Sequence, residues 1–305
     1  MHVGELPLVT FTILAQLAVG SFVVLGVIQL VARRRGGGDV VDRLSDPALY
    51  AIGPVMVLGL AASILHLGNP ANMLNAFRNV DSSWLSREVL LGCAFAALGA
   101  AFALCQWFRW LTPLLRQLLA GLTALVGLGL VFAMSMVYLL PTVPAWNSWA
   151  TPVSFFTTTL LLGTLNIGAA FTGVTAYRRR RGSTDPAIDE LLGRTLRGIA
   201  VAAIVLVGIE FVVAPVYALS LASAGDGVSG ASASALMAAG GAALVIRLVL
   251  AFAGAVLLGV LLYRVAGSGR HRWVVAVATT AFVLVLASEG IGRVLFYDSM
   301  TRIGV

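Results

Sequence analysis

Residues 112–138 of this chain read TPLLRQLLAGLTALVGLGLVFAMSMVY and carry one charged side chain, Arg116. The run is long enough to cross a bilayer, because a transmembrane helix needs about 20 mostly apolar residues. It lacks the alternation of apolar and polar residues that is typical of a strand in a membrane β-barrel. This stretch therefore predicts a transmembrane α-helix.

Similar apolar runs recur on both sides of this stretch, throughout a chain of 305 residues. The composition agrees with this pattern, because 59% of the residues are hydrophobic and 11% are charged, whereas a soluble domain has about 25% charged residues. The sequence excludes a water-soluble enzyme and predicts an all-α, polytopic integral membrane protein with eight transmembrane helices in one domain, 1–305. The expected spans are approximately 7–32, 48–66, 86–108, 112–138, 152–177, 195–222, 234–264 and 272–296.

The arginines are distributed unevenly between the two sides of these spans. All twenty basic residues are Arg, and fifteen of them lie in or beside the odd-numbered loops. Four lie in the even-numbered loops and at the C-terminal end, and Arg247 lies inside a span. Basic loop residues are held on the cytoplasmic side, so we expect a multi-pass protein of the plasma (cytoplasmic) membrane with both termini outside. This distribution explains the net charge of +7 without a nucleic-acid partner.

The cysteine and histidine content argues against a resident metal centre. Cys93 and Cys105 lie in one apolar run without a C-x-x-C motif. The histidines are His2, His66 and His271, and no two of them are expected at mid-membrane, where they would sandwich a haem. We therefore expect no haem, no iron–sulfur cluster and no other metal in this chain.

Charged side chains within the spans are candidate functional residues, because a charge at the bilayer centre costs at least about 2.5 kcal/mol. Glu210 and Arg247 lie near mid-depth in adjacent antiparallel spans. A structural ion pair is the simpler interpretation, and a proton or substrate path is the alternative. Glu289 and Arg293 are one turn apart on one helix face, where they could form a local salt bridge or contribute to a pocket.

His66 ends the second expected span, and Glu88 begins the third beside Arg87. The two spans are joined by one outer loop, so we expect His66 and Glu88 to converge on an outer pocket. An ordinary interfacial histidine is the simpler interpretation of His66 alone. A quinol, however, loses two protons with its two electrons and needs proton acceptors beside an apolar slot. The candidate catalytic residues are therefore His66 and Glu88, and the further candidates for the quinol pocket are Arg87, Glu289 and Arg293.

Three motifs occur in a fixed order along the chain. H-L-G-x-P lies at 66–70, L-S-x-E at 85–88 and E-x-I-G-R-x-x-F-Y at 289–297. Together with the segments Thr142 to Trp146 and Ala150 to Phe156, they make this protein resemble the membrane anchor subunit of dimethyl sulfoxide reductase, the DmsC family. The resemblance covers nearly the whole sequence and implies eight spans with both termini outside.

The resemblance also implies partners and a substrate. The family anchor holds an iron–sulfur subunit and a molybdopterin catalytic subunit at the outer face and oxidises menaquinol for them in anaerobic respiration. It places the roles of the quinol site on His66 and Glu88. The protein would then bind menaquinol and belong to an oxidoreductase complex without catalysing the terminal reduction, whose acceptor stays open. Two alternatives are a secondary transporter that uses Glu210 and Arg247, and a purely structural anchor.

Overall fold

The computed structural model describes residues 6–34, 38–65, 78–183, 185–223, 241–265 and 271–300. In these ranges the regular structure is entirely helical, and eight helices are long and apolar enough to cross a membrane. This confirms the predicted all-α membrane fold. The helices are α1 (Leu6–Arg34), α2 (Gly38–Leu65), α3 (Trp84–Trp107), α4 (Pro113–Val137), α5 (Ala150–Arg180), α6 (Pro186–Ser223), the span Gly241–Arg264 with η3 (Phe252–Leu257) and α8 (Leu258–Val265), and α9 (His271–Asp298).

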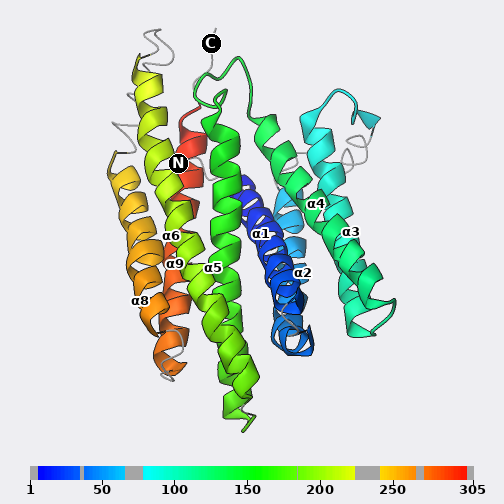
Figure 1. The fold of residues 1–305 in the computed structure, drawn as a ribbon. Helices are drawn as coiled ribbons and strands as arrows, with labels where there is room; N and C mark the ends of the chain where they lie inside the picture. The colour runs from blue at the N-terminus through cyan, green and yellow to red at the C-terminus, as the bar shows by residue number, and fades with distance from the viewer. Residues whose placement is uncertain are drawn as a thin grey trace.

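The helices pack as an elongated bundle around α5 (Figure 1). α5 contacts α1, α6 and α9, while α3 and α4 form a hairpin that packs against α1, α2 and α5. The helix ends next to the odd-numbered loops lie together at one end of the bundle, the lower end in Figure 1. Residues 78–83 and 138–149 lie at the opposite end, which is here called the loop end. The side of the membrane that each end faces stays a prediction.

α2 starts at Gly38, well before the span expected at 48–66. Its first turns carry two aspartates that pair with arginines of neighbouring segments: Asp42 with Arg33 at 2.6 Å, and Asp46 with Arg109 at 3.0 Å. Hydropathy marks only the apolar part of a helix. The charged first turns are helical because cross-helix partners hold them, and the sequence did not indicate those partners.

α6 likewise starts at Pro186, before the span expected at 195–222. Its charged first turns form an ion pair between Asp189 and Arg179 of α5, and a second one along the helix between Glu190 and Arg194 at 2.6 Å. Charged side chains are unfavourable in hydrocarbon, so these first turns extend beyond the apolar section of the helix.

The connection between α3 and α4 is as short as the sequence predicted. Thr112 caps α4 by accepting a hydrogen bond from the Leu115 amide, and Pro113 occupies the first turn. Arg109 and Leu111 take left-handed backbone conformations, with φ of 56° and 65°. These two residues reverse the chain within a few positions, which makes α3 and α4 antiparallel neighbours.

α1 and α5 approach closely where two glycines meet. A Cβ added to Gly20 would overlap the backbone of Thr159, and one added to Gly163 would overlap the backbone of Gly20. Small residues allow such close approach between membrane helices. Nearby, Asn166 donates a hydrogen bond to Ser21 at 2.9 Å. This contact fixes α5 against α1 and so places the polar side chains of both helices in the site below.

Candidate functional site

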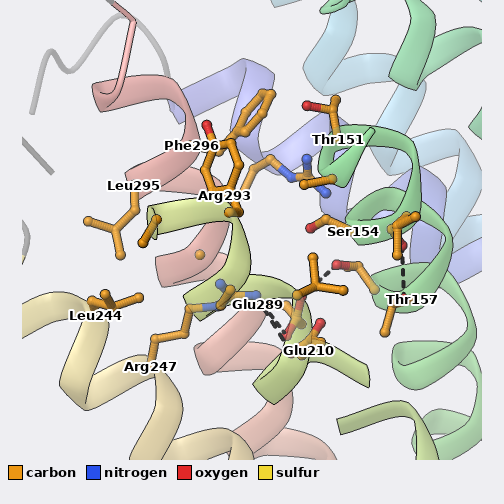
Figure 2. Close-up of a pocket in the computed structure, with 18 of the residues that line it drawn as sticks. Thr151, Ser154, Thr157, Glu210, Leu244, Arg247, Glu289, Arg293, Leu295 and Phe296 are labelled. Carbon is orange, nitrogen blue, oxygen red and sulfur yellow. Dashed lines mark hydrogen bonds and ion pairs between the residues drawn. The ribbon is translucent and has the colours of Figure 1, made fainter. Parts of the chain in front are cut away.

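A cavity of about 110 Å³ lies among α5, α6, α9 and the span Gly241–Arg264 (Figure 2). Four of the sequence-predicted site residues line it, one or two from each of three spans: Glu210, Arg247, Glu289 and Arg293. Glu210, Glu289 and Arg293 are only 6%, 2% and 4% exposed. The structure therefore brings these four charged residues together inside the bundle.

Arg247 lies between two carboxylates. Its Nη2 atom is 3.6 Å from Oε2 of Glu210 and 3.8 Å from Oε1 of Glu289. Figure 2 shows both contacts converging on the guanidinium. The other oxygen of Glu289, Oε2, accepts a hydrogen bond of 2.6 Å from the Thr158 hydroxyl of α5. The expected approach of Glu210 and Arg247 is thus part of a three-residue cluster that includes Glu289.

Two residues of α9 accommodate Arg247. A Cβ added to Gly292 would overlap its guanidinium, with the Cζ atom at 2.8 Å. Ser288 donates a hydrogen bond of 2.9 Å to the Arg247 backbone carbonyl. Gly292, the glycine of the E-x-I-G-R motif, therefore leaves the space that the Arg247 guanidinium fills.

Arg293 makes no salt bridge with Glu289 in the part of the protein that the structure describes. Its Nη2 atom instead donates to Gln16 Oε1 of α1 at 2.9 Å, and Gln16 in turn donates to the Phe155 carbonyl of α5 at 2.9 Å. The guanidinium also stacks on the Phe155 ring at 3.8 Å. The local salt bridge considered from the sequence does not form, because a neighbouring helix engages each partner.

Glu88 belongs to a second group of buried residues, outside the lining of this cavity. It lies in the second turn of α3 and is 7% exposed. Burial raises the pKa of the Tyr138 phenol well above its ordinary value, and the nearby Tyr297 phenol and Glu88 carboxyl raise it further. The hydroxyl groups of Tyr138 and Tyr297 lie 2.9 Å apart. Glu88 therefore lies near a pair of hydrogen-bonded phenols.

Arg87 has a local role. Its guanidinium donates to the Val80 carbonyl at 2.8 Å and to the Asp81 carbonyl at 2.7 Å, and it lies over the Trp84 ring at 4.3 Å. These contacts hold the turn 78–83 against the start of α3. Arg87 does not line the cavity.

His66 lies outside the described residues, so its position relative to Glu88 stays a prediction. α2 ends at Leu65, the residue before it.

The sequence did not indicate the aromatic cluster between the two groups. Tyr138, Trp146 and Phe296 pack together, and the Trp146 Nε1 donates to the Phe296 carbonyl at 2.8 Å. Nor did it single out Gln16 and Thr158, which contact the charged residues directly. The sequence showed only that each is an uncharged polar residue within an apolar run. Such residues often hydrogen-bond to the backbone of their own helix, so this feature alone did not indicate a role in the site.

Comparisons with known proteins match nearly the whole sequence. The family model described as DMSO reductase anchor subunit (DmsC) matches residues 1–298. The anaerobic dimethyl sulfoxide reductase subunit YnfH of Escherichia coli K12 is 31% identical over 301 residues, which cover 99% of this protein and 96% of that one. The C subunit of the anaerobic dimethyl sulfoxide reductase of the same strain is 30% identical, again with 99% and 96% coverage. The corresponding C subunit of Haemophilus influenzae Rd is 29% identical, with 96% and 94% coverage.

Proposed function

This protein belongs to the DMSO reductase anchor subunit (DmsC) family, and we propose on that premise that it oxidises menaquinol near Glu88 for its partner subunits. It is the multi-pass membrane anchor subunit of a DMSO reductase family complex. As an anchor it serves catalytic and electron-transfer subunits. We propose that these partners are a molybdopterin protein and an iron–sulfur protein.

The observation that carries the proposal is the burial of Glu88 at the loop end. A buried carboxyl near the end of a transmembrane helix can take a proton from a quinol headgroup that arrives within the bilayer. Glu88 has no ion-pair partner among the described residues, so its carboxyl is not already neutralised by a cation. The adjoining pair of Tyr138 and Tyr297 places two hydroxyl groups within a cluster of packed aromatic rings.

His66 is the proposed second proton acceptor. Oxidation of one quinol to the quinone releases two protons and two electrons. We assign one proton to His66 and one to Glu88. The two electrons would pass, one at a time, to iron–sulfur clusters of the partner subunit. The molybdopterin subunit then uses the two electrons to reduce the terminal acceptor.

The proposed location is the plasma membrane, with the loop end outside. The arginine count supports it, because fifteen of twenty arginines lie in or beside the odd-numbered loops. The partner subunits would dock on the loop end, above Glu88. Protons from the quinol would leave on the same side as the reduced acceptor, so this step would move no net charge across the membrane.

Steady-state activities of the complex in membranes test the proposal. We expect Glu88→Gln and His66→Ala to abolish reduction of the acceptor by menaquinol but to preserve its reduction by a soluble artificial donor, which bypasses the anchor. Glu190→Gln is the matched control, because Glu190 is exposed and lies near the end of α6 that is away from the loop end. This variant should retain both activities. Full menaquinol-dependent activity in both variants would leave a purely structural anchor.

A further inference from the structure

Glu210 and Glu289 both line the cavity, and their carboxyl groups lie near the same atom of Arg247. The Arg247 Nη2 atom is 3.6 Å from Oε2 of Glu210 and 3.8 Å from Oε1 of Glu289. Oε1 of each residue is buried and has no hydrogen-bond partner among the described residues. Two ionised carboxylates have no hydrogen to share, whereas one proton placed between them would satisfy both oxygens. The geometry is that of a carboxyl pair with a single proton.

The charges around the two carboxyl groups also indicate that the pair holds a single proton. Arg247 approaches both carboxyl groups only at 3.6 and 3.8 Å, beyond the roughly 2.7–3.2 Å of an ordinary N–H···O bond. Arg293, on the same helix as Glu289, is bonded to Gln16 and stacked on Phe155. Of the two guanidinium groups that line the cavity, only that of Arg247 lies within 4 Å of these carboxyl groups among the described residues. A second anion in this position would lack a direct partner, which is costly inside a membrane protein.

The cavity has room for water. Its volume of about 110 Å³ exceeds the roughly 10–15 Å³ that one buried water requires. The Nε atoms of Arg247 and Arg293 are also buried without a partner among the described residues. The lining includes Thr151, Thr157 and Ser299, so a water would meet several polar groups. Water here would satisfy donors and acceptors that are otherwise unpaired.

The lining also reaches toward the loop end. It runs along α5 from Thr158 to Ala150, a distance of about 12 Å at 1.5 Å per residue. Ser299, which directly follows the last residue of α9, also lines the cavity. A proton at the carboxyl pair therefore has a polar route to that end of the bundle.

We propose that this cavity is a hydrated proton-binding site in which Glu210 and Glu289 share one exchangeable proton beside Arg247. The groups that face Glu289 are Glu210 of α6, Thr158 of α5, and the guanidinium groups of Arg247 and Arg293. The site rests on its own geometry and does not require that quinol is oxidised at Glu88. It would give the anchor an internal proton store separate from that reaction.

Infrared difference spectroscopy of the resting complex in lipid nanodiscs tests this site without turnover. The wild type should show a carbonyl band of a protonated carboxylic acid that shifts on transfer to D₂O, because water reaches it. Glu210→Gln and Glu289→Gln should each remove this band, since the new amide donates a hydrogen bond and lets the remaining carboxyl ionise. Glu88→Gln and Glu190→Gln should each leave it in place.

Thr158→Val is a second variant that keeps every charge. It removes only the hydroxyl that donates to Glu289, so it should shift the frequency of the same band. A band that persists unchanged in both Glu→Gln variants at the pair, or no shift in Thr158→Val, would overturn the shared proton. A wild-type band that does not respond to D₂O would overturn the hydration. These outcomes are independent of the menaquinol activities that test the proposed function.

Discussion

The hydroxyl groups of Tyr138 and Tyr297 lie 2.9 Å apart although 159 residues separate them in the sequence. Tyr138 ends α4, and Tyr297 lies in the last turn of α9. Tyr138 packs against Phe155, whose ring lies under the Arg293 guanidinium, and the Glu88 carboxyl contributes to the raised pKa of the Tyr138 phenol. The tyrosine pair is therefore the contact at which the Glu88 group and the charged cavity meet.

Removing one hydroxyl of this pair should destabilise the protein. Tyr297→Phe leaves the buried Tyr138 hydroxyl without this partner, which we expect to cost about 1–3 kcal/mol. The double variant Tyr138→Phe/Tyr297→Phe should recover part of this loss, because neither hydroxyl is then left unpaired. Denaturant unfolding in detergent micelles measures the free energy of unfolding of both variants. A double variant that loses twice as much stability as the single variant would contradict the coupling.

Arg247→Ala should lower stability by about 3–5 kcal/mol, because it leaves Glu210 and Glu289 buried without their cation. Adding Glu210→Gln should restore part of the accumulation in membranes. Arg194→Ala is the control, since Arg194 pairs with Glu190 at the surface and exposed pairs contribute under about 1 kcal/mol. Quantitative immunoblots of membranes give the comparison. Normal accumulation of Arg247→Ala would show that the cluster does not support the fold.

Gly292→Ala should displace the Arg247 guanidinium, because the added methyl occupies its place. We expect an effect on accumulation that approaches that of Arg247→Ala. Gly290→Ala is matched in helix and in substitution, and nothing lies within 4 Å of its added Cβ. It should be neutral or slightly stabilising, since alanine favours helices over glycine by up to about 1 kcal/mol. Similar behaviour of the two variants would refute this packing role.

The orientation can be checked with single cysteines in a background without Cys93 and Cys105. Ser82 and Ser183 are suitable positions, because both are exposed and lie outside the helices. We expect Ser82→Cys to react with a membrane-impermeant maleimide in intact cells and Ser183→Cys to react only after lysis. The reverse pattern would place the loop end, and with it Glu88, on the cytoplasmic side.

The sequence alone predicted the all-α fold and all eight membrane helices, because the apolar content of a span is local information. It did not predict the charged first turns of α2 and α6. Those turns depend on ion pairs such as Asp46 with Arg109, whose partners are 63 residues apart. Hydropathy does not register such contacts.

The candidate site was predicted in its residues more than in its geometry. Charged side chains in apolar spans are conspicuous, so the sequence was enough to identify Glu210, Arg247, Glu289 and Arg293. Their partners were not predicted. Thr158 and Gln16 are unremarkable polar residues in membrane helices, and only the packing of α5 and α1 against α9 brings them to Glu289 and Arg293.

The central claim, that menaquinol delivers its electrons through a site at Glu88, is tested most directly by a single turnover. The purified complex is mixed with a soluble menaquinol analogue, and reduction of the partner's iron–sulfur clusters is followed by electron paramagnetic resonance. We predict rapid reduction in the wild type and in Glu190→Gln, and none in Glu88→Gln, although dithionite reduces the clusters in all three. Reduction of the clusters in Glu88→Gln at the wild-type rate would contradict the account.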